Sequence, residues 1–341
     1  MLNKKPGVVI LSLFFGMLFN SGCDNDIELL DQYRETTVIY GLLNVTDTVQ
    51  YIRLEKAFLG EGNALLMAQH ADSIYYDTLD VELTLLRYTN SILTDSIILQ
   101  PTDQLSKEEG LFVNYPHIIY KTTGNELLDP VSTYKLIFYN KKSGKTVFGQ
   151  TPIVKLVGLN PLIPSPLPDP SSTLNLAADD PMQIRIISPV NSKFLSLLIR
   201  INYTDSITGT NQTKKQTLDY NLEMKVTANT NGGQQFEYLI DGEAFYQFLG
   251  RHIKMIPGVY RDASLFNLDF IFTAGAEEFY TYYIVNNSTS SVSDNIPDYT
   301  NLTNGIGIFS SRSVKIYPKK MLNNASMDSL KFGQYTGGLF Q

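Results

Sequence analysis

Apolar and polar positions alternate in short runs between residues 36 and 156, a pattern typical of strands that are buried on one face. In residues 48–58, for example, Ile52 and Leu54 fall on one face and Arg53 on the other. Comparable apolar runs occur at residues 37–43, 81–85, 97–99, 111–113, 118–120, 134–138 and 146–154. Such a density of short strands predicts an immunoglobulin-like antiparallel β-sandwich over residues 36–156. Residues 60–77 lack the alternation and are expected to form a loop.

A proline-rich stretch separates this region from the rest of the chain. Five prolines lie within residues 160–170, and neither a helix nor a sheet interior accommodates them, so residues 157–181 are expected to form an extended connector. The strand pattern resumes in residues 182–318 and predicts a second β-rich domain. Residues 242–253, which Asp241 can cap, and residues 276–285 predict one or two short helices there. Residues 319–341 are weakly patterned and are expected to be a polar tail.

The first residues of the chain have the pattern of a secretory signal. Two lysines precede a short apolar run at residues 8–19, which is too short to span a membrane as a helix, and small residues follow. Cys23, directly after Gly22, makes the segment similar to a bacterial lipoprotein signal, although Asn20 occupies a position where that motif usually has an aliphatic residue. We therefore expect a signal peptide over residues 1–22, cleavage between Gly22 and Cys23, and lipid on Cys23. An ordinary secretory signal is the alternative.

Residues 23–35 follow as an acidic segment, which we expect to be a tether. Its first residues, 24–26, resemble the acidic signal that directs some Bacteroidota lipoproteins to the cell surface, although a solvated spacer would also be acidic. The predicted location is the outer membrane, on either its periplasmic or its outer face, with the surface favoured.

Composition narrows the classes of function. The formal charge is −7, and it becomes more negative by two units when Lys4 and Lys5 leave with the signal peptide, so no basic footprint for nucleic acid is present. Cys23 is the only cysteine, which excludes a disulfide within the chain and a cysteine-based metal site. The acids at residues 24–26 lack the spaced loop of a calcium site. We expect no metal and no cofactor.

The sequence contains no recognisable catalytic motif. The three histidines, at positions 70, 117 and 252, are scattered, and there is no nucleophile elbow, zinc-protease helix or phosphate-binding glycine loop. Two carboxylate pairs, at residues 179–180 and 277–278, would suit a glycosidase, but turn chemistry accounts for the first pair and a helix start for the second, and we favour these structural explanations. A non-enzymatic role is the main expectation, and a carboxylate-dependent hydrolase of surface carbohydrates is the alternative.

Two further patterns indicate candidate sites. Tyr282 is expected to point outward from its helix, where it could stack on a sugar ring, while Tyr280 and Tyr283 face the core. The pattern Asp-(Ser/Thr)-aliphatic occurs six times and resembles the O-glycosylation motif of exported Bacteroidota proteins, although it also describes a turn that enters a strand. The candidate acceptors are Thr48, Ser73, Thr78, Ser96, Ser206 and Ser329.

The order of these parts resembles a known family. A lipoprotein signal, an acidic tether, alternating strands at residues 81–85 and 133–136, a proline connector and the closing segment NLTNGIGIF at residues 301–309 are similar to domain-of-unknown-function family 4249 of Bacteroidota outer-membrane lipoproteins. The resemblance implies a β-rich envelope lipoprotein with a binding or accessory role, often beside a TonB-dependent receptor, and transfers no catalytic residue. A structural or adhesive surface protein is a further alternative.

Overall fold

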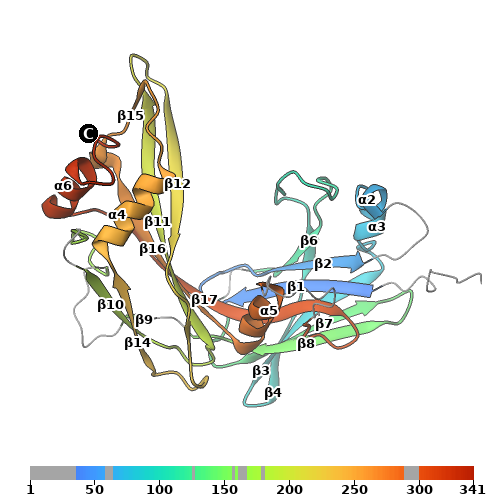
Figure 1. Ribbon diagram of the computed structural model, residues 1–341. Coiled ribbons are helices and arrows are strands. Elements are labelled where there is room, and N and C mark those ends of the chain that lie inside the picture. The colour runs from blue at the N-terminus through green and yellow to red at the C-terminus, as the bar shows by residue number, and fades with distance from the viewer. Residues whose placement is uncertain are drawn as a thin grey trace, which may run out of the picture.

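The computed structural model describes residues 36–57, 64–124, 127–155, 158–159, 167–177, 181–287 and 299–341. These residues form two β-rich halves that share one continuous 10-stranded sheet (Figure 1). Two smaller sheets, of four and three strands, complete the fold. The expected class is confirmed: the protein is mainly β, with an antiparallel sandwich first and a second β-rich part with short helices after it.

The first half is a sandwich of two sheets. Its strands are β1 (Thr36–Asn44), β2 (Tyr51–Ala57), β3 (Val81–Thr89), β4 (Ile92–Ile98), β5 (Gln100–Thr102), β6 (Ile119–Lys121), β7 (Thr133–Asn140) and β8 (Thr146–Pro152). The sheet β4-β3-β7-β8 packs on the β1-β2-β6-β5 end of the large sheet. Alternation produces the core, since Tyr134, Leu136 and Phe138 of β7 are all buried on one face.

Two short helices lie in the region that was expected to be a loop. They are α2 (Ala64–Met67) and α3 (Ala71–Ile74). Ile74 and Tyr76, at and after the end of α3, are buried, and the Tyr76 ring packs 5.1 Å from that of Phe138. A short helical segment satisfies its backbone groups locally while it brings these apolar side chains onto the sandwich, which accounts for the difference.

The second half combines strands and helices around a separate core. Its elements are β9 (Gly158–Leu159), β10 (Met182–Ile187), β11 (Phe194–Ile207), β12 (Thr213–Asn221), β13 (Lys225–Val226), β14 (Gln235–Ile240), α4 (Gly242–His252), β15 (Val259–Tyr260), η1 (Ala263–Leu265), β16 (Asn267–Gly275), α5 (Glu277–Asn287), β17 (Ile306–Lys320) and α6 (Asn324–Phe332). The small sheet β14-β10-β9 and helix α4 cover the core face of β11 and β16. The predicted cap of α4 is present, because the Asp241 carboxylate accepts a hydrogen bond from the Ala244 amide at 3.0 Å.

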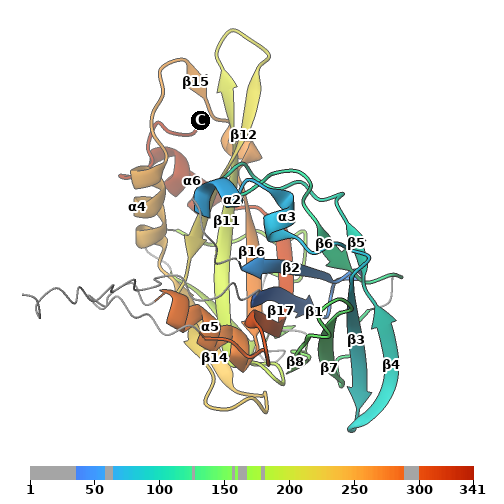
Figure 2. The same cartoon turned by 90° about the vertical axis from the view of Figure 1, so that its right-hand side faces the viewer.

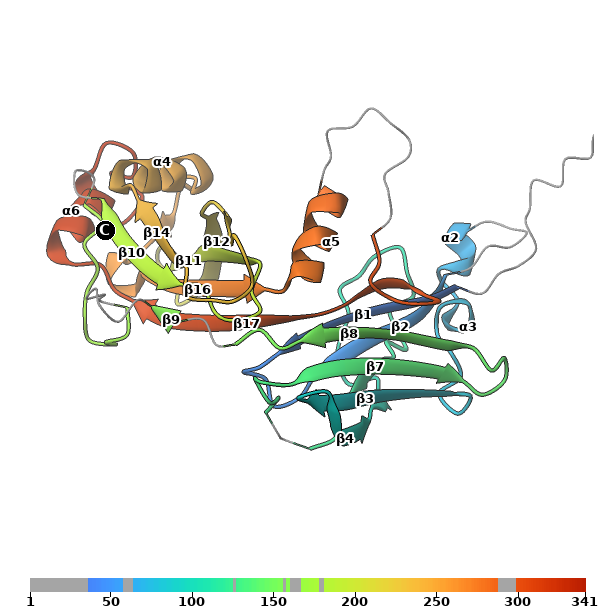
Figure 3. The same ribbon diagram turned by 90° about the horizontal axis from the view of Figure 1, so that it is seen from below.

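Strand β17 joins the two halves. Its first part pairs with β1 in parallel, from Val38 with Ile306 to Asn44 with Arg312, and its second part pairs with β16. Figure 3 shows this long strand running from the sandwich into the second half. The closing segment at residues 301–309, expected in the second domain, therefore completes the first: the Phe309 ring is fully buried in the sandwich core.

The closing segment has a structural explanation. The Asn301 side chain donates a hydrogen bond to the Phe309 carbonyl at 2.7 Å and accepts one from the Phe309 amide at 2.9 Å. Gly307 has φ = +107°, and a Cβ atom there would overlap the carbonyl oxygen of Ile39 on β1. The Asn301 side chain and Gly307 thus permit the close parallel pairing of β1 and β17.

The chain end is folded rather than being a free polar tail. Helix α6 begins after Asn323, whose side chain accepts a hydrogen bond from the Ser326 amide, and Leu330 and Phe340 are buried in the second core. The described part of the connector packs there too, since the Leu174 amide donates to the Met321 carbonyl at 2.8 Å. A few apolar side chains are enough to hold these segments in place, because each side chain packs against a core that the strands of the second half form.

Helix α5 lies across the outer face of the large sheet, where the halves meet (Figure 2). Phe279 packs against Phe194 of β11, with ring centroids 5.4 Å apart. Tyr283, expected on the core side, is 43% exposed, whereas Tyr282 turns toward the sheet. No described helix has both the length and the apolar character needed to cross a membrane.

Candidate functional site

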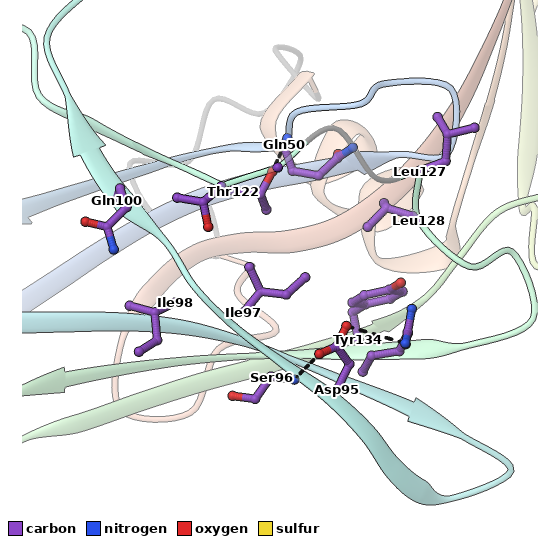
Figure 4. Close-up of a pocket in the computed structure, with 13 residues that line it drawn as sticks. Gln50, Asp95, Ser96, Ile97, Ile98, Gln100, Thr122, Leu127, Leu128 and Tyr134 are labelled. Carbon is purple, nitrogen blue, oxygen red and sulfur yellow. Dashed lines mark hydrogen bonds and ion pairs between the residues drawn. The ribbon is translucent and has the colours of Figure 1, made fainter.

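A pocket of about 540 Å³ opens at the edge of the sandwich, between the two sheets (Figure 4). It lies where the chain leaves β4 and crosses at the buried Leu99 to β5 in the opposite sheet. Where the chain passes from one sheet to the other at the edge of a sandwich, side chains only partly fill the space between the two sheets. The pocket is within the size range of small-molecule sites, and we take it as the candidate functional site.

The floor of the pocket is apolar. Ile97 of β4, Leu128 and the ring of Tyr134 line it, and Leu128 and Tyr134 are almost fully buried. Ile98 and Leu127 line its mouth and are 50% and 59% exposed. A ligand here would cover exposed apolar surface, which favours binding.

One wall is held by Gln50, which precedes β2. Its side-chain amide donates hydrogen bonds to the carbonyls of Asn44 at 3.1 Å and Asp47 at 2.7 Å, and its oxygen accepts one from the Asn44 amide. The Gln50 backbone amide donates to the Thr122 hydroxyl at 3.0 Å, and the Thr122 amide donates back to the Gln50 carbonyl. These bonds fix the wall, because every polar atom of the Gln50 side chain is already satisfied.

An ion pair forms the polar side of the pocket. Arg87 of β3 and Asp95 of β4 are register partners, and their side chains approach to 3.4 Å. The Arg87 guanidinium also donates to the Thr94 hydroxyl at 3.3 Å. Both charged side chains are about one-third exposed, so the pair offers hydrogen-bonding atoms to the pocket while its charges cancel.

The turn beside the pocket positions Tyr134. Its hydroxyl accepts a hydrogen bond from the Asp129 amide at 3.0 Å. Asp129 in turn accepts hydrogen bonds from the Ser132 hydroxyl at 2.6 Å and the Val131 amide, and the Ser132 bond is the main cause that lowers the pKa of the Asp129 carboxyl. Burial raises the pKa of Tyr134. The pocket thus presents a neutral phenol rather than a phenolate.

A second polar cluster lies outside the sandwich, beneath α5. Burial, with a hydrogen bond to Tyr282 as the second cause, raises the pKa of Tyr40 to about 12. The Arg53 guanidinium lies over the Tyr40 ring and pairs with Glu55 at 2.7 Å. Nearby, burial raises the pKa of the Glu278 carboxyl, whose Oε2 atom has no hydrogen-bond partner among the described residues. Because Tyr282 of α5 packs on Tyr40 of β1, we interpret this cluster as part of the interface between α5 and the sheet.

The expected catalytic candidates do not meet in the pocket. His117 Nδ1 lies 3.0 Å from the Leu105 carbonyl oxygen, and His252 Nδ1 lies 2.8 Å from the Phe248 carbonyl oxygen within α4. The acids at 277–278 begin α5, as the helix-start explanation predicts, and those at 179–180 fall at positions that the structure does not describe. Within the described ranges no group of three or more potential metal ligands is present.

The candidate modification sites fall on different kinds of structure. Thr48 lies in the turn after β1 and Thr78 in the turn before β3, where Asp77 accepts a hydrogen bond from the Leu79 amide. Ser73 lies in α3, Ser96 in β4 at the pocket, Ser206 in β11 and Ser329 in α6. The turn explanation therefore fits only some of the sites. Glycosylation of these residues stays a prediction.

The remaining predicted site residues have separate outcomes. Gly22 and Cys23 lie outside the described residues, together with the signal peptide and tether. Tyr282, expected to be free for a sugar, lies with its ring 6.2 Å from that of Tyr40. Stacking of a ligand on Tyr282 stays a prediction, and it would require displacement of this contact.

Comparison with known proteins adds little. No protein-family model matches the chain, and no curated protein matches it. One solved structure, described as "Cytokine receptor complex - Crystal form 1A", aligns with 84% of this chain and 99% of its own, at 9% sequence identity and a TM-score of 0.19. A likeness at this level supports no conclusion about fold or function.

Proposed function

We propose that this protein is a lipid-anchored binding or accessory protein of the bacterial outer membrane, and that its sandwich pocket holds a small, polar, uncharged ligand. The observation that carries the proposal is the composition of the pocket. Its ionised groups, Arg87 and Asp95, neutralise each other, while an apolar floor at Ile97 and Leu128 lies beside them. Polar atoms at the side and apolar surface below suit recognition of a ligand with both kinds of surface.

The same features argue for binding rather than turnover. A nucleophilic or general-base mechanism needs a titrating group that faces the reacting atom. The carboxylate that lines this pocket is Asp95, and it is engaged by Arg87 and by the Ser96 amide at 2.8 Å. The carboxylate oxygens of Asp95 are therefore engaged by groups of the protein itself and are not directed at a reacting atom.

The outer-membrane location and the partner rest on the sequence. Cys23 carries the proposed lipid, and the resemblance to family 4249 supports a role beside a TonB-dependent receptor. A tether ahead of β1 would place the sandwich, with its pocket, as the first folded unit after the anchor.

Filling the pocket tests the proposal. Ile98→Arg places a long charged side chain at the mouth, and Ile92→Arg is the matched control, since Ile92 is exposed on the same strand but does not line the pocket. The lipidated proteins are purified from their own membranes, and their bound small molecules are identified by native mass spectrometry. We expect one polar, uncharged species on the wild type and on Ile92→Arg, and its loss from Ile98→Arg.

Two results would contradict the proposal. One is the absence of a bound species from the wild type even after incubation with the small-molecule extract of the same cells. The other is conversion of the bound species to a product by the wild type and not by Ile98→Arg, which would make the pocket an active site.

A further inference from the structure

A second cavity, a groove of about 440 Å³, lies on the second half, far along the chain from the sandwich pocket. It forms on the outer face of the large sheet, where β12, β11, β16 and the end of β17 are neighbours (Figure 2). Strand register places Asn202 of β11 between Thr217 of β12 and Asn267 of β16, and places Thr204 beside Lys215. The groove is therefore lined by amides, hydroxyls and an ammonium group.

A β-bulge adds a second lysine to the groove. The pairing of β16 with β17 shifts between Leu268, which pairs with Lys320, and Phe270, which pairs with Tyr317. At the bulge Lys319 has φ = +53°, an uncommon conformation for a residue with a side chain. Bulges often redirect a side chain next to a functional site. Here Lys319 lines the groove, while the next residue, Lys320, is buried.

Asp269 holds the bulge in place. Its Oδ1 atom accepts a hydrogen bond from the Lys319 amide at 2.8 Å, and its Oδ2 atom accepts one from the Asn202 side chain at 3.1 Å. The adjacent Arg200 is engaged by Asp219 in a two-point pair at 2.8 and 2.9 Å. The carboxylates of Asp269 and Asp219 are therefore engaged by hydrogen bonds or an ion pair within the protein.

The two lysines of the groove form no ion pair with a carboxylate of the described residues. Neither Lys215 nor Lys319 has its ammonium group within 4.0 Å of a carboxylate among the described residues. The Asp269 carboxylate also lines the groove, but two ammonium groups against one carboxylate still leave a local site of net positive charge in a chain with a formal charge of −7. It is complementary to an anion that also carries hydroxyl groups.

We infer that this groove binds an acidic oligosaccharide. The ammonium groups of Lys215 and Lys319 take carboxylates of the sugar. Because the Asn202 and Asn267 side-chain nitrogens already donate to groups of the protein, the hydroxyls of the sugar donate to the Asn202 side-chain oxygen and pair with the Thr204 hydroxyl. Amide and hydroxyl groups on a rigid sheet suit such a ligand, because little side-chain freedom is lost on binding. The inference does not depend on the sandwich pocket or on a receptor partner.

Neighbouring lysines on β12 provide a matched test. Lys215 lines the groove, whereas Lys214 projects from the opposite face of the strand, so Lys215→Gln and Lys214→Gln remove the same charge one residue apart. Lys319→Asn removes the second charge with a residue that tolerates positive φ. Calorimetric titration of the full mature protein uses hexamers of galacturonate and of mannuronate, with a neutral glucose hexamer for comparison.

We expect the wild type to bind at least one uronate hexamer and to bind the glucose hexamer at least tenfold more weakly. Lys215→Gln and Lys319→Asn should each weaken uronate binding about tenfold, or about 1.4 kcal/mol, while Lys214→Gln leaves it within twofold. Failure of the wild type to bind either uronate would overturn the inference. Equal losses in Lys214→Gln and Lys215→Gln would also overturn it, since they would show attraction by overall charge and not by the groove.

Discussion

The pairing of β1 with β17 predicts the effect of an alanine at Gly307. That residue combines a positive φ with a backbone contact, because its Cβ atom would overlap the Ile39 carbonyl oxygen. Alanine substitutions at two other glycines separate the effect of the positive φ from the effect of the backbone contact. Gly144 has φ = +71° with nothing within 4 Å of its would-be Cβ, and Gly110 has open space and no positive φ.

The expected losses of stability differ by steps. Gly110→Ala should change the free energy of unfolding by no more than about 0.5 kcal/mol. Gly144→Ala should lose about 1 to 2 kcal/mol, the cost of a left-handed conformation for a residue with a side chain. Gly307→Ala adds a forced separation of two central strands, at about 1 to 3 kcal/mol more, so its total should reach about 3 kcal/mol.

Urea unfolding of the mature chain measures these differences. Circular dichroism and tyrosine fluorescence are suitable probes, since the chain has 21 tyrosines and no tryptophan. The reasoning is refuted if Gly307→Ala is as stable as Gly144→Ala, because β1 and β17 would then not pair as closely as described.

Three further changes test other parts of the structure. Asp205→Ala leaves the buried guanidinium of Arg261, now paired at 2.6 Å, without its carboxylate and should cost about 3 kcal/mol in urea unfolding, whereas Lys142→Ala breaks an exposed pair and should leave the unfolding midpoint nearly unchanged. Asn301→Ala removes two hydrogen bonds to the β17 backbone and should cost about 2 kcal/mol by the same measure; an unchanged midpoint would contradict the bracing role. Because burial raises the pKa of Glu278 above its ordinary 4.5, the folded state holds its proton more tightly, and stability falls as pH rises through the folded pKa. Glu278→Gln should therefore be more stable than the wild type at pH 7 and equal to it below pH 4, and a constant difference across this range would contradict burial as the cause.

Local patterns predicted much of the fold. The alternation of Tyr134, Leu136 and Phe138 identified β7 and its buried face, and Asp241 identified the start of α4. Both signals depend on neighbours in the sequence, where the periods of strands and the hydrogen bonds of caps are visible.

Strand periodicity and helix caps could not predict which segments pair across long distances in the sequence. The parallel pairing of Ile39 with Gly307 joins two segments that lie far apart in the sequence, and only the glycine and asparagine of the closing segment hint at it. Lys320 was placed in a polar tail, yet it is 1% exposed and its ammonium group donates to the Asp169 carbonyl. A lysine is seldom fully buried, so its neighbourhood has to be known before such burial can be expected.

The candidate site was predictable only in part. The turn at residues 89–91 places Tyr88 opposite Leu93, and that register alone would have brought Arg87 opposite Thr94. A bulge between Arg87 and Tyr88 shifts the register by one residue and brings Arg87 opposite Asp95, which the turn does not predict. Gln50 and Thr122 form a wall of the pocket across 72 residues of sequence, and no local pattern distinguishes them from other polar residues. The sandwich edge, where the pocket opens, exists only once both sheets are in place.

The most direct test of the proposed role is an affinity purification of the tagged, lipidated protein from its own detergent-solubilised outer membrane, with partners identified by mass spectrometry. A Cys23→Ser variant, which cannot carry the lipid, serves as the control. We expect one TonB-dependent receptor in near-stoichiometric amount with the wild type, and little with Cys23→Ser. Recovery of the lipidated protein from the outer membrane without any receptor would contradict the accessory role.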